Sequence, residues 1–173
     1  TLKVYKEMRK KNESRTVSNR GGYQSPLLLR EEREKIFTTN VMKDILEEAM
    51  SMYDWKKPLS FNIDGAWFNA NEAGDYNISH RHSKSHFSFV WYLKVPDSSS
   101  GQLILEHPDS ALIMTGLFDL ERNNKNHYNS EVMQITPSEG LMVMFPASLK
   151  HRVERYEGQA TRVSLAFNGS FKQ

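Results

Sequence analysis

The sequence contains no cysteine among its 173 residues. This absence excludes disulfides, thiolate nucleophiles, iron–sulfur clusters and cysteine-based zinc sites, and it fits a protein of the cytoplasm. Any metal must therefore be held by His, Asp or Glu side chains, and the chain has six histidines. Metal chemistry in this protein would depend on nitrogen and oxygen donors alone.

A large net charge and long apolar runs are also lacking. Lys and Arg number 23 against 21 Asp and Glu, and the net charge of +2 is too small for a nucleic-acid binder that works by counterion release. No window approaches about 18 consecutive apolar residues, and no basic-then-apolar leader opens the chain. We therefore expect no nucleic-acid partner, no membrane span and no secretory signal. Neither a P-loop nor a dinucleotide-binding fingerprint occurs.

The sequence does contain the material for one folded domain. Its length is close to the roughly 150 residues of an average domain. Hydrophobic residues make up 38% of the chain and aromatic residues 11%, which argues against disorder. We expect residues 1–173 to form a single domain in which residues 1–57 give helical support and residues 58–173 form the core.

The pattern of apolar residues predicts a mainly β protein (class α+β) with helices at its N-terminus. Residues 39–53 repeat apolar side chains at steps of three and four, as an amphipathic helix does. Residues 1–25 predict a short helix and then a loop. After Pro58, short apolar stretches alternate with Gly, Pro, Asn and Ser clusters, which is typical of an antiparallel sandwich or barrel. The expected strands are residues 61–69, 87–95, 102–105, 132–135, 141–145 and 162–167.

Two histidines separated by one residue form the first candidate metal site. In an extended segment alternate side chains share a face, so His80 and His82 would point one way and Arg81 the other. One strand can supply two ligands to a single metal in this manner. The alternative is a pair of ordinary histidines in a surface turn.

A third histidine and an arginine follow much later in the chain. His151 comes just after an apolar strand and a Pro-containing bend, where it would be either a ligand from a second strand or a surface residue. Arg162 and Ser164 share one face of an apolar strand. A buried arginine is costly unless it meets an anion, and its planar fork suits a carboxylate. Exposure on the polar face of a half-buried strand is the alternative.

Taken together, these residues describe a metal beside a carboxylate clamp. Nitrogen or mixed nitrogen and oxygen sites with open positions suit ferrous iron in oxygen chemistry, and zinc is also compatible. Asn69 and Asn77 are candidates for the lining of the same pocket. His86, His107 and His127 lie in loop-like sequence and are expected to be outside the metal site.

Many short motifs occur along the chain in one order. They are residues 18–25 (SNRGGYQS), 66–69 (AWFN), 80–82 (HRH), 88–96 (SFVWYLKVP), 100–101 (SG), 137–140 (PSEG), 145–146 (FP), 162–164 (RVS) and 167–168 (FN), together with His151. In this order they resemble the iron(II)- and 2-oxoglutarate-dependent oxygenases of marine bacteria and their phages, relatives of the prolyl 4-hydroxylases. The resemblance runs from about residue 10 to residue 168, and it implies a double-stranded β-helix (a cupin-like jelly roll) braced by N-terminal helices. Family members begin a little earlier, so the chain is expected to lack a first strand.

The resemblance implies a role for each candidate residue. His80 and His151 match the family's metal ligands, but the relatives have Asp two positions after the first histidine, where this chain has His82. We expect His82 to be the third ligand; the alternatives are another metal or a carboxylate from elsewhere. Arg162 matches the arginine that grips the distal carboxylate of 2-oxoglutarate, with Ser164 as a second donor, and Tyr92 matches a tyrosine that bonds the same group. The alternative carboxylates are Asp75, Glu106 and Asp109.

The function implied is an Fe(II)- and 2-oxoglutarate-dependent dioxygenase that couples decarboxylation of 2-oxoglutarate to succinate with hydroxylation of a substrate. The partners implied are 2-oxoglutarate, O2 and a small-molecule or peptide substrate, a prolyl residue among the candidates; a homodimer is left open. If the protein is phage-encoded, its place is the host cytoplasm. The rival functions are a non-catalytic jelly roll that binds a ligand or partner, and a three-histidine metal enzyme that does not use 2-oxoglutarate.

Overall fold

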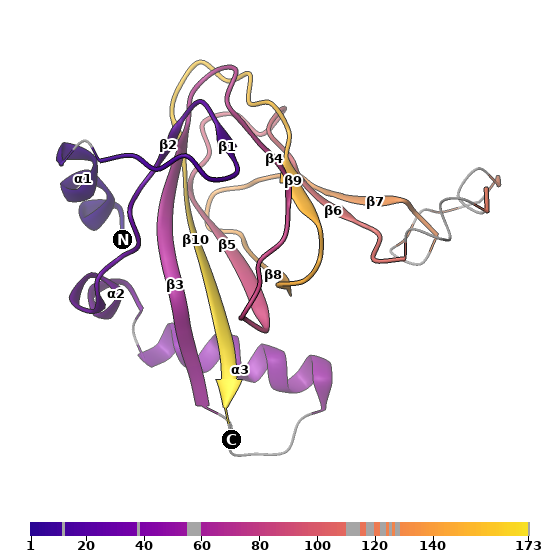
Figure 1. Ribbon diagram of the computed structural model, residues 1–173, viewed down its shortest axis with the longest axis horizontal. Coiled ribbons are helices and arrows are strands. Elements are labelled where there is room, and N and C mark those ends of the chain that lie inside the picture. Colours follow the sequence, from indigo (N-terminus) through magenta and orange to yellow (C-terminus); the bar gives the residue numbers. More distant parts are fainter. Residues whose placement is uncertain are drawn as a thin grey trace.

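Two antiparallel sheets of five strands each form the centre of the described part of the chain in a computed structural model (Figure 1). The sheets face each other, and helices cover the outer face of one of them. This is the mainly β, double-stranded β-helix fold expected from the sequence. The structure describes residues 1–11, 13–37, 39–54, 60–109, 115–116, 120–121, 124, 126 and 129–172.

The first sheet has the strand order β1-β4-β9-β6-β7. Its third strand, β9, pairs on both sides, so that His151 lies opposite His80 in one neighbour and opposite Leu105 in the other. Side chains far apart in the sequence are thereby brought into one row. The strands of this sheet are β1 (Asn19–Arg20), β4 (Tyr76–His80), β9 (His151–Val153), β6 (Leu103–Glu106) and β7 (Val132–Ile135).

The second sheet has the order β2-β3-β10-β5-β8 and contains the two longest strands. The pairing of β3 with β10 shifts register between Asn168 and Gly169, which leaves Asp64 as an extra, bulged residue. The strands of this sheet are β2 (Tyr23–Gln24), β3 (Ser60–Asn71), β10 (Arg162–Lys172), β5 (Phe87–Lys94) and β8 (Met142–Pro146).

Side chains on β10 alternate between the two faces of the second sheet, as the period of two in a strand requires. Leu165 and Phe167 are fully buried on the face toward the helices. Arg162, Ser164 and Ala166 face the space between the sheets. One face of the same strand therefore builds the core, while the other presents polar groups to an internal pocket.

Three helices cover the outer face of the second sheet within the described residues: α1 (Leu2–Lys10), α2 (Arg30–Ile36) and α3 (Thr39–Tyr53). Helix α3 crosses the ends of β3 and β10 (Figure 1). Burying a large apolar side chain contributes about 1.5–3 kcal/mol, so this contact stabilises both layers. The main core contains Val4, Met8, Leu28, Ile36, Ile45 and Ala49 from the N-terminal region, and Ala66, Phe68, Phe87, Phe89, Leu165, Phe167 and Phe171 from the sheet.

The predicted helix over residues 39–53 coincides with α3, and all six predicted strands are present. Strands β4 and β9 and helix α2 were not predicted as elements. Strand β10 is longer than predicted, because its last residues, as far as Lys172, pair with β3 and bury Phe171. The loop expected within residues 1–25 instead contains β1 and β2. These strands lie in different sheets and are joined by Gly21 and Gly22, both at positive φ, a backbone conformation that favours glycine.

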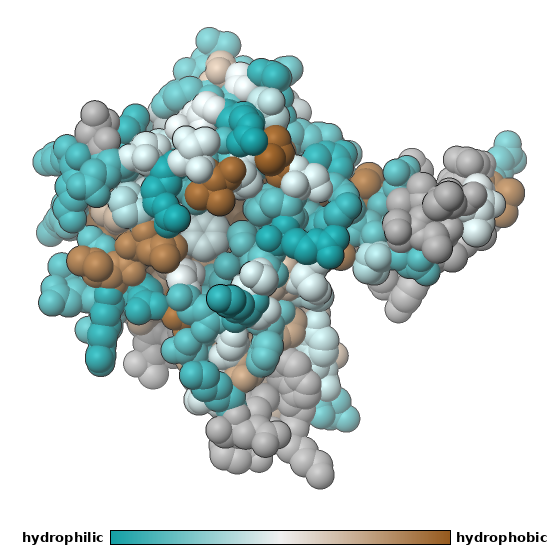
Figure 2. Space-filling model, viewed as in Figure 1, coloured by the Kyte–Doolittle hydropathy of each residue, from teal (hydrophilic) through white to brown (hydrophobic). Residues whose placement is uncertain are grey.

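The visible surface carries small, separate hydrophobic patches among hydrophilic residues (Figure 2). Leu27 and Leu29, which precede α2, are among the exposed apolar side chains. Scattered patches of this size are normal for a folded domain. None of the described helices is both long enough and apolar enough to cross a membrane.

Candidate active site

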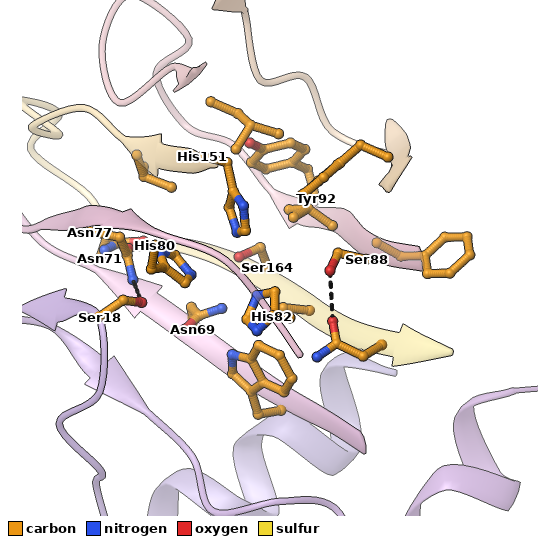
Figure 3. A pocket seen from close by; sticks show the side chains of 18 of the residues that line it. Ser18, Asn69, Asn71, Asn77, His80, His82, Ser88, Tyr92, His151 and Ser164 are labelled. Atoms are coloured by element: carbon orange, nitrogen blue, oxygen red, sulfur yellow. Dashed lines mark hydrogen bonds between the residues drawn. The ribbon is translucent and has the colours of Figure 1, made fainter. Parts of the chain in front are cut away.

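A pocket that is partly open to solvent lies between the two sheets (Figure 3). Both sheets contribute to its wall, which is rich in serine, asparagine and histidine and also contains Arg162. Among the described residues that line it, none is Asp or Glu. The pocket is therefore polar but carries no negative charge of its own.

Three histidines converge in this pocket: two lie on strands of the first sheet, and the third, His82, follows β4. The ring centroids of His80 and His151 are 4.2 Å apart, and each lies about as close to His82, at 5.0 and 5.1 Å. One ring nitrogen from each residue lies within 4.8 Å of the others. Figure 3 shows the three rings pointing toward one another. This spacing allows all three nitrogens to bind one ion.

The backbone explains why His82 joins the group although β4 ends at His80. The backbone N–H of His82 donates to the Ala147 carbonyl at 2.9 Å, so the chain stays extended alongside the segment before β9. His80 and His82 consequently face the pocket, while Arg81 is exposed to solvent. The alternation expected from the sequence is confirmed, even though only one of the two histidines lies within the strand.

Hydrogen bonds to the backbone orient two of the three rings. Nδ1 of His80 lies 2.8 Å from the Ile78 carbonyl, and Nδ1 of His151 lies 2.9 Å from the Leu149 carbonyl. Because a carbonyl oxygen only accepts, Nδ1 must carry the proton in each case, and the Nε2 lone pair is left free. A second hydrogen bond of this kind is the usual way in which metal-binding histidines are oriented.

Burial keeps the imidazoles uncharged at neutral pH. It lowers the pKa of His80, and it lowers the pKa of His82 and of His151 to about 4. Repulsion from His80 adds to the shift at His82, and repulsion from both other rings adds to the shift at His151. A metal ligand must be deprotonated, so these rings are ready to bind without first losing a proton.

The three carboxylates considered as alternative ligands, Asp75, Glu106 and Asp109, are not part of the histidine group. Asp75 accepts from the Glu72 backbone N–H at 2.7 Å, and Glu106 accepts from the Ser79 hydroxyl at 2.6 Å. Asp109 is exposed beside His107. Among the described residues, the group of potential metal ligands that converges consists of the three histidines without a carboxylate.

Arg162 enters the pocket from the opposite sheet and is only 2% exposed. Its Nη2 donates to the Asn71 Oδ1 at 3.0 Å, its Nη1 donates to the Gly101 carbonyl, and its Nε–H is buried without a partner. No ion pair joins Arg162 to any described carboxylate. Burial lowers the pKa of this guanidinium, but arginine still remains charged. A buried cation with a vacant donor is suited to an incoming anion.

Hydroxyl and amide groups lie next to Arg162 on the three central strands. Ser164 pairs in register with Asn69 on one side and with Tyr92 on the other. Burial raises the pKa of Tyr92 to about 12, so its hydroxyl keeps its proton and can donate a hydrogen bond. The expectations that Asn69 and Asn77 line the pocket are confirmed.

Two partners of Arg162 were missed in the sequence: Asn71 and the Gly101 carbonyl. Asn71 could have been found by extending the alternation of β3 by one step beyond Asn69. No local signal indicates Gly101, which belongs to another part of the chain. Of the remaining histidines, His86 and His107 lie outside the cluster, and His127 is outside the described residues.

Known protein families include one that matches this chain. A family model described as "Putative 2OG-Fe(II) oxygenase" matches residues 65–168, well over half of the chain. The matched part contains the three pocket histidines and Arg162. No curated protein sequence matches this chain.

Several solved structures share the fold. An oxidoreductase of the 2OG-Fe(II) oxygenase family from Burkholderia pseudomallei has a TM-score of 0.66 at 12% identity, over 98% of this chain and 78% of that one. A Pseudomonas putida prolyl-4-hydroxylase has a TM-score of 0.55 at 15% identity, over 99% and 84%. A viral collagen prolyl hydroxylase from Paramecium Bursaria Chlorella virus-1, in its 2OG complex, has a TM-score of 0.57 at 13% identity, over 97% and 87%. Identities this low establish the fold alone.

Proposed function

This chain belongs to the 2OG-Fe(II) oxygenase family, and from that premise we propose that it is an iron(II)- and 2-oxoglutarate-dependent dioxygenase. In the proposed reaction, one O2 oxidises two molecules. One oxygen atom enters succinate as 2-oxoglutarate loses CO2, and the other replaces hydrogen on a substrate carbon as a hydroxyl group. The electrons balance without any further reductant.

One observation carries this proposal: neutral imidazoles on one sheet face a buried guanidinium on the other, across a single pocket. A metal site alone would not require Arg162. A cation that is 2% exposed, with no described carboxylate beside it and an unpartnered Nε–H, is favourable only if an anion completes it. The histidine group fits a metal, and Arg162 fits the carboxylate of a keto acid that is bound to that metal.

We propose that His80, His82 and His151 hold the iron through ring nitrogens. Bound iron(II) supplies the redox chemistry with O2, which no side chain of this protein can supply. The Ile78 and Leu149 carbonyls hold two of the rings in position by accepting their Nδ1 protons. Because all three ligands are neutral, the charge of the metal would be compensated by the bound 2-oxoglutarate.

We propose that Arg162, Tyr92 and Ser164 bind the distal carboxylate of 2-oxoglutarate. Arg162 provides the charge and the vacant Nε–H, while the Ser164 hydroxyl on the same strand and the protonated Tyr92 hydroxyl on the neighbouring β5 add donors. Placing the anion at this depth fixes the orientation of the keto acid relative to the histidines. It also removes water from the carboxylate, which strengthens these hydrogen bonds.

The substrate to test first is a peptidyl proline. Two of the solved structures named above are prolyl hydroxylases, and this choice of substrate follows from the analogy of fold alone. Loops at the mouth of such a barrel set specificity, so a substrate panel should include other peptide residues and small molecules.

An anaerobic mixture of metal-free protein, ferrous iron and 2-oxoglutarate tests the co-substrate directly. We expect a visible metal-to-ligand charge-transfer band, followed by release of succinate when air is admitted. Iron binding without the band would favour a three-histidine enzyme that does not use 2-oxoglutarate. Failure to bind iron would favour a non-catalytic jelly roll.

A further inference from the structure

Among the described residues, the hydrogen-bond and ring partners of the buried Arg162 are all neutral. Its two described hydrogen-bond acceptors are an amide oxygen, Asn71 Oδ1, and a backbone carbonyl, that of Gly101. The ring of Tyr156 lies 5.0 Å from the guanidinium carbon. Each of these groups can satisfy an N–H without cancelling the positive charge. Buried charges in proteins are usually paired instead, so this arrangement calls for an explanation.

Asn71 is placed to orient the guanidinium. It is 4% exposed, it is the last residue of β3, and it lies directly opposite Arg162 in the pairing with β10. Its amide is equal in size to the carboxylate of an aspartate. An aspartate at this position would accept the same hydrogen bond and would also neutralise Arg162.

Gly101 provides the second neutral acceptor. It has a positive φ of 68°, and a methyl group on its Cα would collide with Nη1 of Arg162. Glycine is therefore required both for the backbone conformation and for the close approach of the carbonyl. With Nη1 and Nη2 each bonded to a fixed neutral oxygen, the guanidinium cannot rotate freely, and its Nε–H remains available.

We propose that Asn71 is a positioning residue that holds Arg162 in its binding orientation while leaving its charge uncompensated, so that the pocket selects a dianionic co-substrate. The proposal rests on the proposed use of 2-oxoglutarate. Asn71 would thus control the affinity for 2-oxoglutarate through Arg162, although its own side chain is uncharged and need not touch the co-substrate. A purely structural asparagine would instead affect affinity and stability in the same direction.

Two substitutions at one position separate these alternatives. In Asn71→Asp the new carboxylate pairs with Arg162 and competes with 2-oxoglutarate, so we expect an affinity loss of about 10- to 100-fold. The melting temperature of the metal-free protein should stay equal or rise. In Asn71→Ala the guanidinium loses one partner but keeps its charge, so affinity should fall only about three- to tenfold, and the melting temperature should fall by about 2–4 °C.

The measurement is an anaerobic titration of each ferrous protein with 2-oxoglutarate, followed by the charge-transfer band, with bound iron measured separately. Wild-type affinity in Asn71→Asp would overturn the proposal. So would an Asn71→Asp protein that loses stability together with affinity, or that does not fold, because the aspartate must pair with Arg162 in place. If wild-type protein binds iron but not 2-oxoglutarate, the proposed function itself fails, which is a different result.

Discussion

Burying polar groups in the pocket is unfavourable unless they form hydrogen bonds, and one of these groups has no hydrogen-bond partner among the described residues. A buried donor without a partner costs about 1–3 kcal/mol, and the Nε–H of Arg162 is such a donor. The Nδ1 hydrogen bonds of His80 and His151 also leave the Nε2 lone pair of each ring available to a metal. We interpret these unsatisfied groups as positions that ligands complete.

Removal of Arg162 should separate co-substrate binding from metal binding. We expect Arg162→Met to weaken 2-oxoglutarate binding by about 10- to 100-fold, because hydrogen bonds to a charged group are lost. Iron content should not change, since the histidines are on the other sheet. Arg155→Met is the matched control: Arg155 is exposed and donates to the Gly74 carbonyl outside the pocket. Unchanged affinity in Arg162→Met would remove the co-substrate assignment.

Removal of His151 should abolish metal binding. His151→Ala leaves two of the three proposed ligands and removes the ring that lies opposite His80 in the β4–β9 pairing. Iron affinity should therefore fall by more than about 100-fold. Metal analysis after dialysis against ferrous iron measures this directly. His107→Ala removes a histidine outside the cluster and should retain iron. Full occupancy in His151→Ala would show that the ligand set is wrong.

At the scale of elements, the second sheet separates stability from function by the alternation of its strands. Along β10, neighbouring residues face either the helix-covered core or the pocket. Phe167 stacks on Phe89 at a centroid distance of 4.5 Å, whereas Ala166 lies between Trp67 and Val90 on the pocket side. Substitutions at adjacent positions of β10 should therefore affect different properties: co-substrate affinity on the pocket side and stability on the core side.

We expect Ala166→Leu to weaken 2-oxoglutarate binding about tenfold by overfilling the pocket, with little change in the core. Phe167→Leu should instead lower the free energy of unfolding by about 1–3 kcal/mol while leaving affinity close to wild type. Urea unfolding and anaerobic titration of both variants give the comparison. Equal effects of the two variants on affinity would contradict the assignment of faces.

At the scale of the whole molecule, we propose that residues 1–173 fold as one domain in which residues 1–57 support the jelly roll of residues 58–173. The largest core cluster contains side chains from both parts, and the ring of Phe37 lies 4.9 Å from that of Phe167. A chain that starts at residue 58 should therefore expose this apolar face and aggregate. Light scattering and circular dichroism would test it, and a soluble, cooperatively unfolding fragment would contradict the proposal.

Acid should destabilise the metal-free protein. An unfolded chain has imidazole pKa values near 6.5, but in the fold those of His82 and His151 are about 4. Between these values the unfolded state binds more protons, so the free energy of unfolding decreases as pH falls from about 6.5 toward about 4. Melting temperatures across this range measure the effect. A His82→Gln/His151→Gln double variant should show a shallower dependence; an equal slope would assign the effect to other groups.

Local patterns in the sequence were sufficient for the elements that are long and regularly patterned. The helix over 39–53 and the six predicted strands were predictable because each buries one face, which imposes its period on the residues. The two-residue strands β1 and β2 are too short to carry a period, and they were missed. Strand β10 was predicted too short because its last five residues include Gly169 and polar side chains, which do not show the apolar pattern of a strand.

By itself, the sequence determined which chemical groups were present: histidines one residue apart, a later histidine, an arginine in an apolar strand, and no cysteine. Only the tertiary structure decided which of these groups meet. The pairing of β4 with β9 brings His80 to His151, and the Gly101 carbonyl reaches Arg162 across 61 residues of chain. Such contacts depend on long-range strand pairing, which residues distant in sequence determine jointly and no local window contains.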